Sequence, residues 1–285
     1  MVLIRFSPVL ALLLGATLWG VIWYPLRQLE AHGFDGLWLT LAVYVAALLI
    51  SAPRAVRWMH EFRSYPKVVW ALALAGGCTN VAFVLAVLDG NVLRVLLLFY
   101  LSPLWAVMLG WFVLHERISP LSVCILSLAM SGAVIMLWQP ALGIPWPQSH
   151  ADWLAIGSGF AFAVSNVIVR GAQHVSIGAK AVSTWLGVAF VAAALIAFFQ
   201  IPAPDVTLAV ALAAFALGAV AISVMTVLVQ YGVTQIPVHR SAVILLFELV
   251  AGAVSQQLLT DETMTIIELT GGALIIVAAY LSARL

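Results

Sequence analysis

The sequence predicts an all-α protein with ten transmembrane helices, and three observations carry this prediction. Hydrophobic residues make up 65% of the 285 residues and charged residues only 8%, a balance too apolar for a soluble domain of this length. About ten apolar segments each approach the roughly 20 residues that a helix needs to cross a bilayer. Closed barrels also cross membranes, but their strands alternate polar and apolar residues, and the run LAVALAAFALGAVAISVMTVLV does not.

The ten predicted spans follow one another with short connections. We place them at 8–26, 36–52, 68–88, 92–113, 120–138, 152–170, 178–199, 208–232, 238–259 and 264–283. The breaker residues agree: ISAPRAVR ends the second span, Pro120 suits the first turn of the fifth, and QPALGIPWPQSH at 139–150 cannot remain helical. The first segment is too long for a secretory signal, so we expect it to be retained as a helix.

Lysine and arginine are distributed unevenly over the connections. If the N-terminus is cytoplasmic, only Arg27 and Arg94 lie on the outer side. The inner side then receives Arg5, Arg54, Arg57, Arg63, Lys67, Arg117, Arg170, Lys180, Arg240 and Arg284. Cytoplasmic connections are enriched in these residues, so the sequence predicts that both termini are cytoplasmic.

The chain contains an internal repeat. Residues 94–117 align without gaps with residues 240–263, which pairs Arg94 with Arg240 and Glu116 with Glu262. We therefore divide the chain into a first five-helix repeat at 1–139, a connecting loop at 140–151 and a second five-helix repeat at 152–285. Five is an odd number of spans, so the second repeat enters the membrane from the opposite side. Such inverted repeats are common in secondary transporters, with the site near the midplane between them.

Two segments resemble a known family. LLLFYLSPLWAVMLGWFVLHERISPLSVCILSLAMSGAVIML and its second copy, LLFELVAGAVSQQLLTDETMTIIELTGGALIIVAAYL, resemble the signature of ten-helix EamA-type members of the drug/metabolite transporter superfamily. The resemblance implies export of small metabolites, often amino acids, through a cavity lined mainly by helices 1, 3, 4, 6, 8 and 9. The family's second copy usually carries Glu-Pro where this chain has Glu248-Leu249, so we do not count on a helix break at 249. The first copy keeps Ser102-Pro103, and Pro103 is expected to kink the fourth span.

Glu248 is a single carboxylate in the apolar run ILLFELVAGAV, near the middle of the ninth span. A charged side chain there costs about 2.5 to 3.5 kcal/mol on insertion scales and usually faces the interior of the bundle. Two interpretations are open. The carboxyl group ties the ninth helix to its neighbours, or it binds a substrate amine and a proton in alternation. The second interpretation leads to a hypothesis of proton-for-metabolite exchange.

Further polar and aromatic residues are candidates for contact with a substrate. Trp19, Trp23 and Arg27 recur every four residues and form one stripe on the first helix, matched by Phe162, Asn166 and Arg170 on the sixth. The alternative is that these aromatics pack between helices and the arginines reach the interfaces. Isolated candidates, each of which could equally satisfy a neighbouring helix, are Asn80, Tyr100, Trp105 and Gln230.

Arg94 and Arg240 stand at opposite ends of the bundle in the predicted topology. They either orient the chain and reach the interfaces, or they attract substrate carboxylates at the two mouths. We interpret Glu116 and Glu262 as helix-end structure. The cysteines, Cys78 and Cys124, are expected to pack as small apolar residues.

The sequence shows no catalytic constellation, no metal-ligand spacing and no phosphate-binding glycine loop, so we expect no enzyme, metal or cofactor. The leading hypothesis is a secondary active transporter of the inner membrane that exports amino acids or related metabolites by alternating access. Its partners are then a small-molecule substrate, the lipid bilayer and, in the exchange hypothesis, protons, with no nucleic acid; the oligomeric state is left open. Alternatives are efflux of lipophilic cations or drugs, a non-transporting scaffold, and a membrane enzyme.

Overall fold

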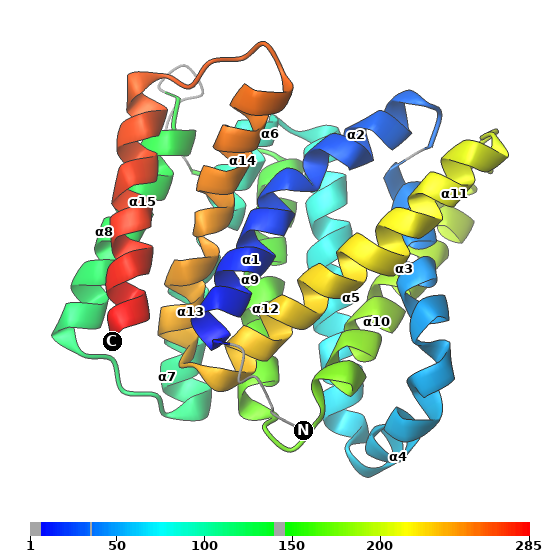
Figure 1. Ribbon diagram of the computed structural model, residues 1–285, viewed down its shortest axis with the longest axis horizontal. Coiled ribbons are helices and arrows are strands. Elements are labelled where there is room, and N and C mark those ends of the chain that lie inside the picture. Colours follow the sequence, from blue (N-terminus) through cyan, green and yellow to red (C-terminus); the bar gives the residue numbers. More distant parts are fainter. Residues whose placement is uncertain (1–6, 35, 140–145) are drawn as a thin grey trace.

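The computed structural model describes residues 7–34, 36–139 and 146–285, and ten helical spans cross the bundle in alternating directions (Figure 1). We call the end where α1 begins and α15 ends the lower face, and the end that contains Asp89 and Leu259 the upper face. The described residues contain no β-strand. The predicted all-α fold with ten transmembrane helices is therefore confirmed.

Five spans are single helices. They are α5 (Pro66–Asp89), α8 (Pro120–Leu137), α9 (His150–Gly171), α10 (Ile177–Phe199) and α15 (Ile266–Arg284). Side chains cap the starts of most of them. Ser149 and Asp152 form a reciprocal capping box at the start of α9, as Thr265 and Glu268 do at α15. These caps satisfy backbone N–H groups that have no partner in the first turn.

The other five spans consist of two helical pieces each. The pairs are α1 (Pro8–Val21) with α2 (Trp23–Ala31), α3 (Gly36–Ser51) with α4 (Ala55–Ser64), α6 (Val92–Phe99) with α7 (Ser102–Leu114), α11 (Leu208–Ala216) with α12 (Ser223–Gln235), and α13 (Val238–Leu245) with α14 (Phe247–Leu259). A π-helical turn, Leu217–Ile222, joins α11 to α12. Interrupted helices are tolerated within a membrane where the freed backbone lines a cavity or is buried in protein.

The second span differs from the prediction. The stretch ISAPRAVR ends α3 at Ser51, as expected, but the chain continues through a 3₁₀ turn at Ala52–Arg54 into α4. Pro53 fits this turn because its missing N–H falls at the start of a new helix, where no intrahelical partner is available. The polar and aromatic residues of α4 suit the lower face rather than the hydrocarbon core, which is why hydrophobic length alone did not reveal this helix.

The fourth and ninth spans break at equivalent places. The repeat alignment places Phe99 on Leu245, the last residues of α6 and α13, and it places Ser102 on Glu248. The first break directly precedes Pro103, where a kink was predicted. The second break, at Leu246, forms without a proline and was not predicted. Here the N–H of Leu246 bonds to the carbonyl of Val243 at 3.2 Å, a three-residue step that interrupts the α-helical pattern.

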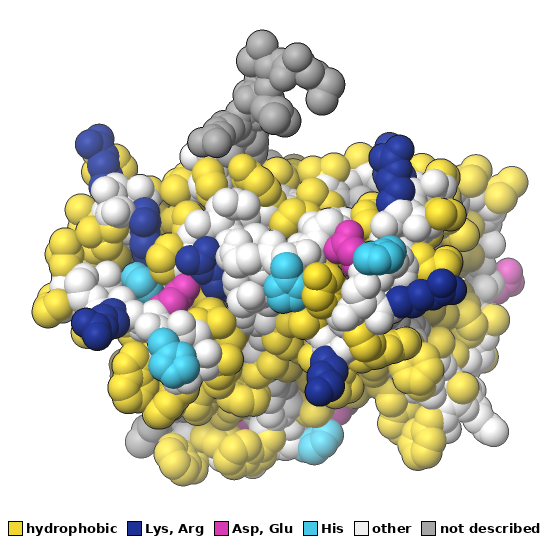
Figure 2. Space-filling model, turned by 90° about the horizontal axis from the view of Figure 1, so that it is seen from below, with side chains coloured by type: hydrophobic (Ala, Val, Ile, Leu, Met, Phe, Trp, Pro, Cys, Tyr) yellow, Lys and Arg dark blue, Asp and Glu magenta, His cyan; other side chains and the backbone are white. Residues whose placement is uncertain are grey.

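The two halves have opposite orientations. Arg94, at the start of α6, lies toward the upper face, while its repeat equivalent Arg240, in the first turn of α13, lies toward the lower face. Lys and Arg side chains are prominent over the lower face in Figure 2. This agrees with the predicted grouping of cations, except that Arg5 lies outside the described residues. That the lower face is cytoplasmic stays a prediction.

Small residues bring several helices into close contact. A Cβ atom on Gly187 of α10 would lie 1.8 Å from the carbonyl oxygen of Ala73 on α5, and one on Gly218 would lie 2.1 Å from the carbonyl oxygen of Val43 on α3. Backbones that approach so closely exclude any side chain at these positions. The expected packing role of Cys78 and Cys124 was wrong, because both are exposed on the outside of the bundle.

Candidate functional site

A cavity of about 190 Å³ lies inside the bundle, between the two repeats. Helices from both halves contribute to its wall, and the breaks in the fourth and ninth spans border it. The lining residues are Trp19, Tyr44, Gly76, Thr79, Asn80, Phe83, Phe99, Tyr100, Phe162, Ser165, Asn166, Val169, Thr184, Val188, Thr226, Val229, Gln230, Leu245 and Glu248. The wall is thus mostly apolar and aromatic, with a limited set of polar groups.

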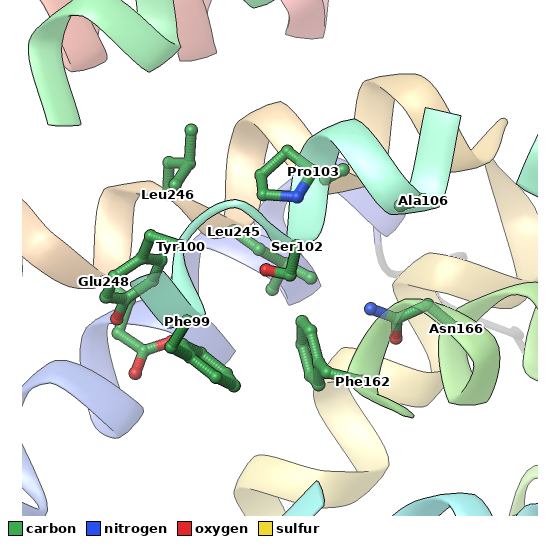
Figure 3. Close-up of a pocket in the computed structure, with 11 residues that line it drawn as sticks. Phe99, Tyr100, Ser102, Pro103, Ala106, Phe162, Asn166, Leu245, Leu246 and Glu248 are labelled. Atoms are coloured by element: carbon green, nitrogen blue, oxygen red, sulfur yellow. The ribbon is translucent and has the colours of Figure 1, made fainter. Parts of the chain in front are cut away.

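Glu248 supplies the one carboxylate of this lining. It belongs to the first turn of α14, directly after the break at Leu246, and stands about half-way along the span Val238–Leu259. Tyr100, which lies in the corresponding break of the fourth span, lines the cavity beside it. Figure 3 shows the two side chains next to each other with their oxygen atoms close together. The two breaks therefore place a carboxylate and a phenol side by side at mid-depth.

A narrower pocket continues from the cavity toward the start of α7. Ser102 and Pro103 line it together with Asn166 of α9 (Figure 3). Both hollows share six residues, which are Phe99, Tyr100, Phe162, Asn166, Leu245 and Glu248. The break in the fourth span thus opens the wall of the cavity on the side of α7.

Aromatic rings cluster around Phe99 on one side of the cavity. The Phe99 ring meets Phe83 edge-on at 5.0 Å between centroids and Tyr100 at 5.2 Å, and it lies 5.7 Å from Phe162. Such pairs add roughly 0.5–1.5 kcal/mol beyond simple burial. The cluster gives the cavity a preformed aromatic wall beside Glu248.

Two amide side chains present unpaired oxygen atoms at the cavity. Asn80 donates its Nδ2 hydrogen to the Tyr44 hydroxyl at 3.0 Å, and Gln230 donates from Nε2 to Thr184 Oγ1 at 3.0 Å. Among the described residues neither Asn80 Oδ1 nor Gln230 Oε1 has a hydrogen-bond partner, although both atoms are buried. Buried oxygen atoms of this kind normally have a partner, so these two are exceptions among the residues that line the cavity.

The cavity brings together six of the predicted site residues: Trp19, Asn80, Tyr100, Asn166, Gln230 and Glu248. Three others lie elsewhere. Trp23 donates from its indole nitrogen to Ser255 Oγ at 2.9 Å and ties α2 to α14. Trp105 packs edge-on against Phe160. The predicted stripe on the first helix is therefore split, because Trp19 faces the cavity and Trp23 faces a neighbouring helix.

Arg94, the remaining predicted residue, is held in an ion pair. Its Nε lies 2.9 Å from both carboxylate oxygens of Asp152, and it also bonds to the carbonyl oxygen of Trp146. Asp152 further accepts the backbone N–H groups of Gln148 and Ser149. This cluster joins the start of α6 to the start of α9, one helix from each repeat, near the upper face. The capping pattern of Ser149 and Asp152 was visible in the sequence, but its link to Arg94 was not.

A second cluster joins the repeats near the lower face. Glu116, just after α7, accepts a bond from Arg170 Nε at 2.9 Å and another from the N–H of Val238 at 2.8 Å. Arg170 also donates to the carbonyl oxygen of Thr234. The interpretation of Glu116 as helix-end structure is therefore incomplete. The residue does lie at the end of α7, but its carboxylate also connects α7 to α9 and α13.

Lys180 lies beside this cluster and is fully buried, with 0% of its surface exposed. Its ammonium group donates to the carbonyl oxygen of Val169 at 2.8 Å and to Thr234 Oγ1 at 3.0 Å. From the sequence, Lys180 was predicted only to lie near the connection between two spans. No local pattern predicted that it is buried. Among the described residues, then, the basic side chains nearest the cavity are already engaged at its ends.

A family model for EamA-like transporters matches the chain twice, at residues 6–138 and 149–284. Together the two matches cover nearly all of the chain. The chain belongs to the EamA-like transporter family. The two matches are the duplicated halves that enclose the cavity, so the fold and the internal repeat are those of this family.

Two individual proteins are informative. An uncharacterized transporter of Pseudomonas aeruginosa is 30% identical over 132 residues, which are 45% of this chain and 42% of that protein. The chain thus matches less than half of this relative's length. A crystal structure with 19% sequence identity superposes with a TM-score of 0.78 and covers 99% of this chain and 98% of its own. At that identity the superposition shows a shared fold.

Taken with the family, these features describe a multi-pass membrane protein of the drug/metabolite transporter type, with a cavity of about 190 Å³ between its two repeats. The cavity lies at the repeat interface near the middle of the membrane, the usual place for a transported substrate. Two of the spans in its wall, the fourth and the ninth, are interrupted at equivalent points.

Proposed function

We propose that this protein is a secondary active transporter of the inner membrane that exports small metabolites, namely amino acids or compounds derived from them, by alternating access. The observation that carries the proposal is the cavity at the interface of two inverted repeats, with Glu248 at mid-depth. Inverted halves can adopt inward-open and outward-open states of similar energy, and rocking of one half against the other exposes a fixed site to either side.

In this proposal Glu248 couples substrate export to proton entry. In the proposal its carboxylate binds the amine of a substrate in one state and a proton in the other, so that metabolite export is exchanged for proton entry. Carboxylates within membrane spans commonly serve such proton relays. The neighbouring Tyr100 hydroxyl supports this role, because it lines the cavity directly beside the carboxylate.

The two polar clusters support the alternating mechanism. The pair of Arg94 and Asp152 joins the repeats near the upper face, and the pair of Glu116 and Arg170 joins them near the lower face. Opening toward either face would separate elements of the two repeats at that end. Each cluster is therefore placed to hold one side closed while the other side opens.

The test is efflux from proteoliposomes loaded with a mixed panel of amino acids, amino-acid derivatives and lipophilic cations, followed by mass spectrometry. With acid outside, we expect the wild type to release a subset of the panel faster than without a pH gradient. Glu248→Gln should lose this acceleration, whereas Glu262→Gln should keep it, because Glu262 is exposed at the end of α14, outside the cavity lining.

Three results would decide against parts of the proposal. A normal response of Glu248→Gln to the gradient would rule out this residue as the proton carrier. Release of lipophilic cations alone would replace the metabolite substrate with a drug-like one. No release of any compound from wild-type vesicles would contradict transport of this panel altogether.

A further inference from the structure

We propose that the cavity selects protonated aromatic amines that lack a carboxylate, and rejects the zwitterionic amino acids from which such amines derive. The inference rests on the proposed transport function and narrows its substrate class. It follows from the balance of charge and hydrogen-bonding groups in the cavity, from its aromatic wall and from its size.

The described lining contains one acidic side chain, Glu248, and no lysine, arginine or histidine. A bound ammonium group would neutralise Glu248, whereas a bound carboxylate would meet no cationic side chain. The nearest basic groups are committed elsewhere: Arg170 to Glu116, and Lys180 to Val169 and Thr234. A charge moved out of water without a partner is strongly penalised, so this lining favours cations.

Two amides of the described lining hold oxygen atoms that lack a hydrogen-bond partner. Thr184 donates its hydroxyl hydrogen to the carbonyl oxygen of Lys180, so its oxygen accepts from Gln230 Nε2. This fixes the amide of Gln230, a residue only 6% exposed, with its oxygen unpaired. Asn80 donates from Nδ2 to the Tyr44 hydroxyl at 3.0 Å, and its Oδ1 is likewise unpaired. A rotation of these two side chains toward the cavity would add acceptors from α5 and α12 to Glu248 on α14, and an ammonium group carries only donors.

Helix N-termini are the other places where a substrate carboxylate could bind, since their first N–H groups lack partners. At α7 this capacity is reduced, because Pro103 has no N–H and the N–H of Leu104 bonds to the carbonyl of Leu101 at 3.0 Å. At α14 the first turn carries Glu248 itself, whose negative charge repels a second carboxylate. Both half-helices are therefore weakened as anion sites.

The remaining wall suits an aromatic ring attached to the amine. Phe99 and its ring partners lie beside Glu248, and Trp19 lines the cavity from α1. A cation next to such faces gains attraction from their π-electrons. For size, an engineered apolar cavity of about 150 Å³ takes up benzene. The cavity here is larger, at about 190 Å³, and is not fully enclosed, so it admits an aromatic ring system with a short aminoalkyl chain.

The experiment compares matched ligands on the purified wild-type protein by isothermal titration calorimetry. The probes are tryptamine, tryptophan, N-acetyltryptamine and N,N,N-trimethyltryptamine, which share the indole and differ in the carboxylate, the charge and the N–H donors. We expect tryptamine to bind at least about ten-fold more tightly than tryptophan, because tryptophan brings a carboxylate with no partner. The neutral amide and the quaternary amine should both be weaker, since one lacks the charge and the other lacks the ammonium N–H donors.

Two variants distinguish binding at the site from nonspecific partitioning of the probes into detergent. Glu248→Gln should weaken tryptamine about ten-fold or more, and Glu262→Gln should leave it unchanged. Tryptophan binding equal to or tighter than tryptamine would overturn the inference while leaving the proposed metabolite exporter standing. The absence of binding by all four probes, in a protein that still releases other metabolites in the efflux panel, would overturn the inference alone.

Discussion

Removal of the Glu116 carboxylate should destabilise the protein, while the same change at its repeat equivalent should not. Glu116→Ala takes away the partner of Arg170 Nε at 2.9 Å and of the Val238 N–H at 2.8 Å. Glu262 instead contacts Gln256 at the exposed end of its own helix. The repeat thus supplies a matched control in which the same residue type lacks the link between halves.

The expected magnitude follows from the two lost bonds. Interhelical hydrogen bonds in membrane proteins average about 0.6 kcal/mol, and bonds to charged groups in soluble proteins contribute roughly 1.5–3 kcal/mol. The side chains of Glu116 and Arg170 retain 16% and 23% exposure, which screens the pair, so the lower part of this range applies. Two bonds therefore predict a loss of about 1–3 kcal/mol in the free energy of unfolding.

The assay is unfolding in mixed detergent micelles of increasing SDS content, followed by tryptophan fluorescence. Glu116→Ala should unfold at lower SDS, and Glu262→Ala should unfold with the wild type. A double-mutant cycle of Glu116→Ala with Arg170→Ala should give a coupling energy of at least about 0.5 kcal/mol. Equal losses for the two glutamates, or a coupling energy near zero, would refute the role of Glu116 as a link between the repeats.

Three further predictions concern packing and ion pairing. Gly187→Val should prevent the close contact of α10 with α5, so that the variant gives no monodisperse peak on size-exclusion chromatography. The control, Gly157→Ala, should fold normally because its added Cβ meets no atom within 4 Å. Arg94→Gln should cost about 3–5 kcal/mol because it leaves a buried carboxylate, and the added change Asp152→Asn should recover much of this loss in the same unfolding assay. Trp23→Phe should cost only about 0.6 kcal/mol, the average for one interhelical bond, and a larger loss would mean that its ring packing dominates.

Hydrophobic length predicted the spans because a bilayer imposes its thickness on each helix regardless of tertiary contacts. The break before Pro103 could be predicted from one residue, because proline removes a backbone donor. The break at Leu246 could not be predicted in this way, because no proline marks it and it consists of three-residue hydrogen bonds. Without the structure, only the gap-free alignment of the repeats could have transferred the first break to the second copy.

The candidate site was predictable to the extent that its polar residues interrupt apolar runs. Glu248, Asn80 and Gln230 stand out in this way, and all three line the cavity. Ion pairs between residues far apart in the sequence could not be predicted. For example, 58 positions separate Arg94 from Asp152, and no periodic pattern joins them. Apolar lining residues such as Phe99 were missed because an aromatic residue in a membrane span looks the same whether it faces lipid, a helix or a cavity.

The central claim is that the cavity between the repeats is exposed to the two sides of the membrane in turn. The most direct measurement places one cysteine at Ser165, in the cavity wall, in a protein whose native cysteines are replaced by alanine. Membrane-impermeant thiol reagents are then added to one side or the other, with Ser64→Cys and Asp261→Cys as controls for the lower and upper faces. We expect Ser165→Cys to be labelled from both sides and each control to be labelled from one. Labelling of Ser165→Cys from one side only, under all gradients and ligands tested, would contradict it.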